Sequence, residues 1–159
     1  MSESTRPLLA VKAAELASRR GASMPEPFAT RLSRRVKHAL GDTFGLKAFG
    51  VNLTRLAAGD ASALHHRHTV QDEFVYVLEG HPTLVGDGGE VDLSPGMCAG
   101  FRASGPAHHL ENRTDRDVLV LEVGDRAPGD QVEYPADDLA LRIDPQGGRH
   151  YSHKDGKPY

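Results

Sequence analysis

The sequence of 159 residues has little of several features, and each scarcity excludes a class of protein. Its one cysteine, Cys98, excludes a disulfide within the chain and is typical of a reducing compartment, so we expect a cytoplasmic protein. The 19 lysines and arginines do not outnumber the 22 acidic residues, and the net charge of −3 argues against a nucleic-acid partner. No run approaches the roughly 18 apolar residues that span a bilayer, so we expect no membrane association. The first 21 residues also lack the layout of a signal peptide.

What remains is the composition of an ordinary globular protein, with 38% hydrophobic and 26% charged residues. The chain is long enough for one domain that buries roughly 70% of its unfolded surface. Composition divides it into an N-terminal extension over residues 1–45, a main domain over 46–124, and a polar tail rich in glycine and proline over 125–159.

The N-terminal extension is rich in basic residues and has weak helical patterns. Apolar residues at helical spacing predict one helix that Gly21 closes and a second short helix over residues 28–40. The basic side chains here are Arg6, Lys12, Arg19, Arg20, Arg31, Arg34, Arg35 and Lys37. They are either an anion or nucleic-acid site or the solvated face of an extension packed on the main domain, and we favour the solvated face.

The main domain has short apolar runs separated by turn residues and no helical pattern. The predicted strands cover residues 46–56, 74–78, 83–85, 91–93, 98–101, 108–112 and 118–123. Gly86 to Gly89 lie between two of these runs and predict a hairpin. Turns every 8 to 12 residues favour an antiparallel sandwich or barrel, so we expect an all-β fold.

Histidines and a glutamate gather around two of these strands. His66 and His68 are two residues apart, so on an extended chain their side chains share one face. Glu73 follows five residues later, and His108 could reach the same point from a strand further along. Three imidazoles and one carboxylate suit a divalent transition metal, and Fe, Mn, Ni and Zn cannot be distinguished from the donor set.

The pattern around these residues resembles the two sequence motifs of the cupin superfamily. His66-x-His68-x4-Glu73-x6-Gly80 matches the first motif, and Gly105-x2-His108-x3-Asn112 matches the second. Within the superfamily the chain is similar to small bacterial single-domain cupins with DEFVYVLEG and a C-terminal HKDGxPY ending. The resemblance implies a double-stranded β-helix, or jelly roll, with one metal in its mouth, the extension and the tail packing on this barrel.

Each candidate histidine has a histidine neighbour, so the ligands must be chosen. Strand alternation leaves His66 rather than His65 on the face of His68, and the motif spacing to Gly105 and Asn112 selects His108 over His109. The predicted metal ligands are therefore His66, His68, Glu73 and His108. We expect His65 and His109 on the surface or behind the ligands.

Further residues near the predicted site have expected roles of their own. Arg55 and Arg102 are candidates for binding an anionic substrate, with surface solvation as the alternative. Asn112 is expected to hold backbone near His108, and Cys98 to be a small buried residue. No second catalytic base is visible on the inner face of the strand that carries Glu73.

Two functions of different kinds fit this site. The first is a metal-dependent enzyme, an oxygenase or an isomerase, that acts on a small polar or anionic molecule; related cupins are described as sugar-phosphate isomerases. The second is a non-catalytic binding or sensor protein in which the metal is structural or holds the ligand. A transcriptional regulator would need a helix-turn-helix, which residues 1–45 do not support. Phe74, Tyr76 and Leu78 form an outward apolar face, for which the extension, the tail or a second copy in a homodimer would provide a cover.

Overall fold

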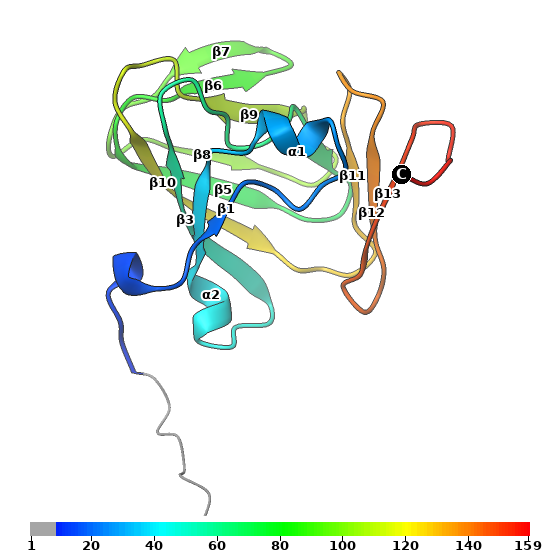
Figure 1. Ribbon diagram of the computed structural model, residues 1–159, viewed down its shortest axis with the longest axis horizontal. Coiled ribbons are helices and arrows are strands. Elements are labelled where there is room, and N and C mark those ends of the chain that lie inside the picture. Colours follow the sequence, from blue (N-terminus) through cyan, green and yellow to red (C-terminus); the bar gives the residue numbers. More distant parts are fainter. Residues whose placement is uncertain (1–8) are drawn as a thin grey trace, which may run out of the picture.

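The computed structural model describes residues 9–159, and antiparallel strands make up most of its regular structure (Figure 1). One layer is a six-stranded sheet. In spatial order its strands are β1 (Arg19–Arg20), β2 (Val36–Ala39), β3 (Phe49–Leu56), β10 (Val118–Asp125), β5 (Glu73–Glu79) and β8 (Cys98–Phe101). The order joins strands that are distant in sequence, as a jelly roll requires.

The opposite layer is made of two smaller sheets. One contains β13 (Arg149–Ser152), β12 (Ala140–Ile143), β11 (Gln131–Glu133) and β4 (Arg67–His68). The other contains β7 (Gly89–Asp92), β6 (Thr83–Gly86) and β9 (His108–Glu111). A bridge between His66 and His108 joins the two sheets, because each residue donates its backbone N–H to the carbonyl of the other, at 3.2 and 2.8 Å. The fold is therefore the predicted all-β double-stranded β-helix.

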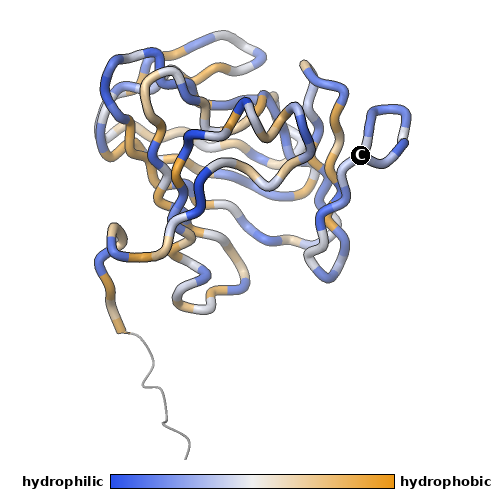
Figure 2. The backbone as a smooth tube through the Cα atoms, viewed as in Figure 1, coloured by the Kyte–Doolittle hydropathy of each residue, from blue (hydrophilic) through white to orange (hydrophobic). Residues whose placement is uncertain are grey.

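Side-chain alternation along β5 separates the inside of the barrel from the outside. Val75 and Val77 point inward and are 4% and 0% exposed, whereas Phe74, Tyr76 and Leu78 point outward and are about two-fifths exposed. Figure 2 shows apolar and polar stretches interleaved along the chain. The outward apolar face predicted on this strand is present, and neither residues 9–45 of the extension nor the tail buries it.

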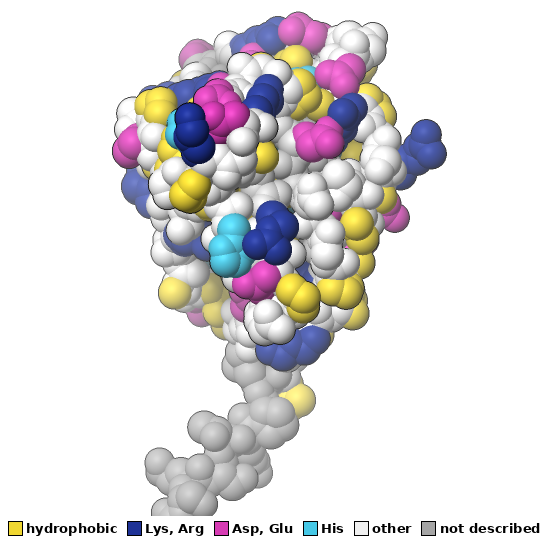
Figure 3. Space-filling model, turned by 90° about the vertical axis from the view of Figure 1, so that its right-hand side faces the viewer, with side chains coloured by type: hydrophobic (Ala, Val, Ile, Leu, Met, Phe, Trp, Pro, Cys, Tyr) yellow, Lys and Arg dark blue, Asp and Glu magenta, His cyan; other side chains and the backbone are white. Residues whose placement is uncertain are grey.

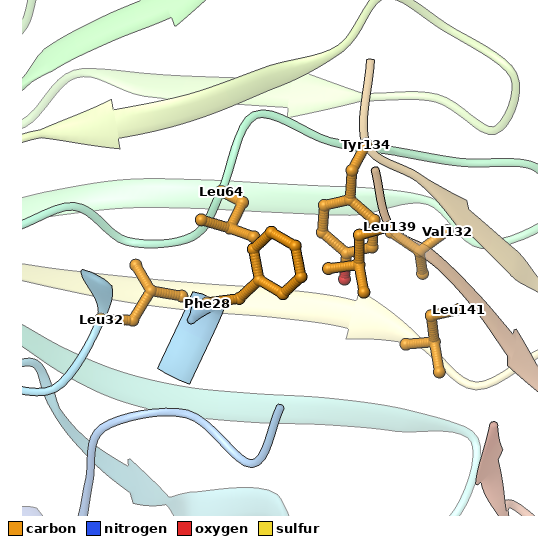
Figure 4. Close-up of a cluster of buried hydrophobic side chains, with 7 residues drawn as sticks. All are labelled: Phe28, Leu32, Leu64, Val132, Tyr134, Leu139 and Leu141. Carbon is orange, nitrogen blue, oxygen red and sulfur yellow. The ribbon is translucent and has the colours of Figure 1, made fainter. Parts of the chain in front are cut away.

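Residues 9–159 form two clusters of buried apolar side chains. One fills the barrel between the layers and consists of Leu56, Val75, Val77, Leu93, Leu110, Val118 and Val120. The other lies where the extension meets the tail, and consists of Phe28, Leu32, Leu64, Val132, Tyr134, Leu139 and Leu141 (Figure 4). In this second cluster Phe28 of α1 (Phe28–Arg31) points toward Leu64 and Tyr134. The two terminal segments therefore share a core with the barrel.

All seven strands predicted between residues 46 and 124 are present, including the hairpin in which Gly86 pairs with Gly89. The helices predicted in the extension are wrong. The first is only a 3-10 turn, η1 (Ala13–Glu15), and the second is replaced by α1, β2 and the short α2 (Leu40–Thr43). The apolar spacing of residues 28–40 is overridden because β2 pairs with β3 and so covers the edge of the sheet.

Most basic residues of the extension are exposed, as the predicted solvated face requires: Lys12, Arg19, Arg20, Arg31 and Arg34 are exposed, whereas Arg35 and Lys37 are half-buried. Arg6 lies outside the described residues. Arg31 forms an ion pair with Asp137 of the tail, and Arg34 with Asp60 at 3.2 Å, so the extension packs on the rest of the protein. Arg19, Arg35 and Lys37 also line the central cavity, which the prediction did not include.

Cys98 was predicted to be buried and is exposed. It lies on β8 at the edge of the six-stranded sheet, where Ala99 and Phe101 take the inward positions. None of the helices among residues 9–159 is long and apolar enough to cross a membrane.

Candidate metal centre

The four predicted ligands meet on the inner surface of the barrel. His66 and His108 are cross-strand neighbours, so their side chains leave the sheet on the same side. His68 is the second residue of β4, and Glu73 opens β5 in the opposite layer. The site is thus built across the space between the two layers.

The ligand atoms converge on a single carboxylate oxygen. Glu73 Oε2 lies 3.2 Å from His66 Nε2, 3.5 Å from His68 Nε2 and 3.2 Å from His108 Nε2. Ligand atoms of His66, His68 and Glu73 all lie within 4.8 Å of one another, a spacing at which they could hold a metal ion. All three imidazoles present Nε2 to the centre, where one metal ion could bind all three.

Contacts behind the rings fix which nitrogen faces the centre. His66 Nδ1 lies 2.9 Å from the Leu64 carbonyl, and His68 Nδ1 lies 2.6 Å from Asp130 Oδ2. An acceptor at Nδ1 keeps the proton there and leaves the Nε2 lone pair free for a metal. The His108 ring instead stacks on Phe101, with centroids 3.4 Å apart and planes 3° from parallel. Its buried Nδ1 has no hydrogen-bond partner in the described chain.

Without a metal, protons bind the same centre. Burial alone would raise the pKa of Glu73, but hydrogen bonds from His108, His66 and His68 hold it well below the usual range. Burial disfavours a charged His68, yet the hydrogen bonds to Asp130 and Glu73 outweigh it and raise the pKa of His68 to about 9. Burial lowers the pKa of His108. These shifts favour an ionised Glu73, a protonated His68 and a neutral His108 near neutral pH, so a divalent cation at this centre would displace the proton of His68.

The centre opens into a cavity of about 730 Å³. Its walls come from the barrel, the extension and the tail, so segments far apart in the sequence enclose it. Tyr134 of the tail stands beside the centre, with its ring centroid 6.2 Å from that of His66. Burial raises the pKa of Tyr134, which keeps its phenol protonated.

The structure separates the two arginines that were candidates for binding an anion. Arg102 lines a small recess beside His68, Glu73 and His108. Arg55 is not among the residues that line the cavity, and it lies 3.5 Å from Asp117 at the surface. Asn112 has the predicted role, since its Nδ2 donates to the carbonyls of Leu56 and Arg116 at 2.9 and 2.7 Å.

His65 and His109 lie on the other side of their strands from the centre and line no part of the cavity. Their Nδ1 atoms are 3.1 Å apart. The Nε2 atom of His65 lies 2.8 Å from Asp87, and that of His109 lies 2.9 Å from Glu111. Each of these two imidazoles therefore contacts a carboxylate through Nε2 and the other imidazole through Nδ1, and neither faces the centre.

Sequence reasoning missed Asp130 and Tyr134, which the tail brings to the centre. Asp130 is fully buried, and its other oxygen accepts the backbone N–H groups of Val70 and Gln71 at 2.9 and 3.2 Å. The alternation of Gln131, Val132, Glu133 and Tyr134 was the one local signal of a strand here.

Comparison with known proteins places this geometry in a family. The family model described as "Cupin domain" matches residues 52–124. A sugar phosphate isomerase of the cupin superfamily from Silicibacter pomeroyi is 38% identical, with a TM-score of 0.88 over 94% of this chain and 96% of that one. A protein described as a proposed sugar phosphate isomerase, from Acidithiobacillus ferrooxidans, is 29% identical, with a TM-score of 0.71 over 79% and 80% of the two chains.

A more distant structure shares the fold alone. The polyketide cyclase RemF from Streptomyces resistomycificus is 19% identical and has a TM-score of 0.60 over 74% of this chain and 79% of that one. No curated protein sequence matches the chain. The matched motifs, the jelly roll and a relative of 38% identity along nearly the whole length lead to one assignment. The chain belongs to the cupin superfamily.

Proposed function

We propose that this cupin is a metal-dependent isomerase that acts on a small phosphorylated sugar. The observation that carries the proposal is the convergence of three imidazole Nε2 atoms and one carboxylate oxygen on the wall of a cavity large enough for such a molecule. His66, His68, Glu73 and His108 would hold the metal, and Fe, Mn, Ni and Zn all suit these donors. The description of the 38% identical relative favours isomerisation over oxygenase chemistry.

The bound metal would supply Lewis-acid polarisation of the substrate's carbonyl group. Isomerisation also needs a base that moves a proton between two adjacent carbons, and Glu122 is suitably placed. It lines the cavity and lies opposite Val75, two residues along the sheet from Glu73 on the same face. Lys37 and the Thr54 hydroxyl both contact its Oε2, so Oε1 is the oxygen that would accept the substrate proton. Such diagonal neighbours are about 7 to 8 Å apart.

The remaining proton transfer is between oxygens, and Tyr134 can assist it. Because burial raises its pKa, Tyr134 is a hydrogen-bond donor rather than a base near neutral pH. Its ring lies beside that of His66, so its hydroxyl can donate to a substrate oxygen near the centre. Glu122 and Tyr134 therefore supply the base and the acid that the inner strand face lacks.

The test is an isomerase assay on a panel of aldose and ketose phosphates in deuterated water. Protein loaded separately with Fe, Mn, Ni or Zn is followed by proton NMR for product and for exchange of the hydrogen next to the carbonyl. We expect Glu122→Gln to lower kcat by about 10² to 10⁴, the usual contribution of a general base. His108→Ala is expected to remove activity and bound metal together.

His153→Ala is the matched control, because this histidine contacts Asp138 in the tail and lines no part of the cavity. No isomerisation with any metal, together with retained metal and sugar-phosphate binding, would establish the non-catalytic binding role instead. Oxygen uptake by the iron-loaded protein would establish an oxygenase.

We also propose that the protein is a homodimer. Its support is the apolar outer face of β5, where Phe74, Tyr76 and Leu78 remain exposed beside the other strands of the sheet. The second partner that we propose for this protein is the small-molecule substrate. Basic and acidic side chains are interspersed on the face shown in Figure 3, and this mixture supports the proposal of a small-molecule rather than a nucleic-acid partner.

A further inference from the structure

Three arginines from three distant segments line the cavity. Arg19 belongs to β1, Arg35 precedes β2, and Arg149 opens β13. None of the three has a carboxylate within ion-pair distance among residues 9–159. The other two basic residues of the cavity are neutralised, because Lys37 lies 2.7 Å from Glu122 and Arg126 is paired with Asp42. The three arginines therefore present positive charge to the cavity.

Arg35 is half-buried and hydrogen-bonded, whereas Arg19 and Arg149 are exposed. The Arg35 guanidinium donates to the carbonyl of Gly21 at 3.3 Å and to that of Ser62. Burial lowers the pKa of Arg35, Glu122 raises it, and the positive charges of Arg19 and Arg149 lower it again. Like charges gathered around a half-buried guanidinium repel one another unless an anion joins them.

Nearby acidic groups do not neutralise this group. Glu122 is engaged by Lys37 and by the hydroxyl of Thr54 at 2.8 Å. Asp144 accepts the backbone N–H groups of Gln146 and Gly148 and lies 2.8 Å from His150 Nε2. Both carboxylates already have partners, so the negative charge that would neutralise the arginines has to come from a ligand.

We propose that Arg19, Arg35 and Arg149 form a subsite for the phosphate group of a phosphomonoester whose other end reaches the metal centre. Guanidinium groups match phosphate oxygens with paired hydrogen bonds, and a phosphate dianion offers more acceptors than a single carboxylate. Tyr134 stands beside His66 and lines the same cavity as the three arginines, so one cavity connects the two ends. This inference rests on the proposed function and names the residues that select the phosphorylated substrate.

All three arginines lie outside residues 52–124, which match the family model. The extension brings two of them over the mouth through the pairing of β1 with β2, in which Arg19 lies opposite Lys37. The tail brings the third through the pairing of β12 with β13, in which Arg149 lies opposite Ile143. The metal ligands are thus a property of the barrel and the phosphate subsite a property of the two terminal segments.

The test measures binding of inorganic phosphate to the full-length protein after its metal has been removed with a chelator. Phosphorus NMR and calorimetry compare the wild type with Arg19→Gln, Arg149→Gln and the double variant. Arg126→Gln is the matched control, because it removes the same charge from the same cavity at a residue already paired with Asp42. Arg19 and Arg149 make no side-chain hydrogen bond within the described residues, so these variants should fold, which circular dichroism verifies.

We expect each of the two single substitutions to raise the dissociation constant about tenfold, as the loss of a charged hydrogen bond does, and the double variant to raise it further. Arg126→Gln should stay within about twofold of the wild type. Wild-type protein that binds no phosphate, or a control that weakens binding as much as Arg149→Gln, would overturn the subsite. Because the measurement needs neither metal nor turnover, an inactive protein whose phosphate binding depends on these arginines would refute the isomerase proposal and leave the subsite standing.

Discussion

Replacing Asp130 by asparagine tests whether the tail controls the metal centre through His68. Asp130 Oδ2 lies 2.6 Å from His68 Nδ1 and fixes the tautomer that directs Nε2 toward Glu73. An asparagine can keep a carbonyl oxygen for the Val70 and Gln71 N–H groups, but then turns its NH₂ group toward His68. The imidazole would respond by carrying its proton on Nε2, where it blocks a metal.

Partners of this kind contribute about 10- to 100-fold to metal affinity, which corresponds to about 1.4 to 2.7 kcal/mol. Asp130→Asn should therefore weaken zinc or nickel binding by that factor in a competition titration against a chelating dye. The measurement is made above pH 9, because Asp130 also raises the pKa of His68 to about 9 and its removal would relieve proton competition at lower pH.

Asp138→Asn is the matched control for this change. Asp138 also lies 2.8 Å from the Nδ1 of a histidine, His153, and accepts the backbone N–H of Lys154 at 2.9 Å, but it does not line the cavity. It should leave metal affinity unchanged. Equal affinities for the two variants, with both folded, would show that His68 is either not a ligand or not oriented by the tail.

Three further outcomes follow from the geometry. The pKa of His68 is raised to about 9, above its unfolded value, so the metal-free protein should lose stability as pH rises toward 9, which thermal melts at several pH values check. Over the same pH range metal affinity should rise about tenfold per pH unit, because the metal competes with the proton on His68, and titrations at several pH values check this. Gly80→Ala should lower the free energy of unfolding by at least about 1 to 2 kcal/mol in urea melts, because φ at Gly80 is +79° and the new Cβ would lie 2.7 Å from the Asp117 carbonyl oxygen. Gly88→Ala is the control: a Cβ there would meet open space, so the stability should change little. Tyr76→Glu should convert a dimer to a monomer in light scattering without loss of fold, and an unchanged mass would exclude the outer face of β5 as the interface.

The barrel and its four convergent side chains follow from local sequence patterns. Alternation puts His66 and His68 on one face of the chain, and short apolar runs between turns define the strands that carry Glu73 and His108. These patterns act over a few residues, and the strand ladders preserve them in the folded chain. The local pattern around Cys98 gave the wrong prediction that this residue is buried. Only the pairing of β8 with β5 shows which face of β8 points outward.

The residues that surround the centre could not be predicted in this way, since their roles depend on long-range pairing. Asp130 reaches His68 only because β11 pairs with β4, which joins positions about 60 residues apart. Arg35 lies in a segment with helical spacing that folds as the approach to an edge strand. A polar tail and a basic extension carry no periodic signal strong enough to specify such pairings.

This difference in predictability parallels a division of roles within the fold. The four candidate metal ligands belong to residues 52–124, whereas Tyr134, Asp130 and the arginine cluster belong to segments outside them. Three imidazole Nε2 atoms lie within 3.5 Å of Glu73 Oε2, and the tail supports one of these imidazoles, that of His68, through Asp130 and the pairing of β4 with β11. A related barrel whose terminal segments kept an acceptor for His68 would keep the ligands and could receive a different substrate. Substrate selection in this protein is therefore to be sought in the extension and the tail rather than in the motifs that identify the family.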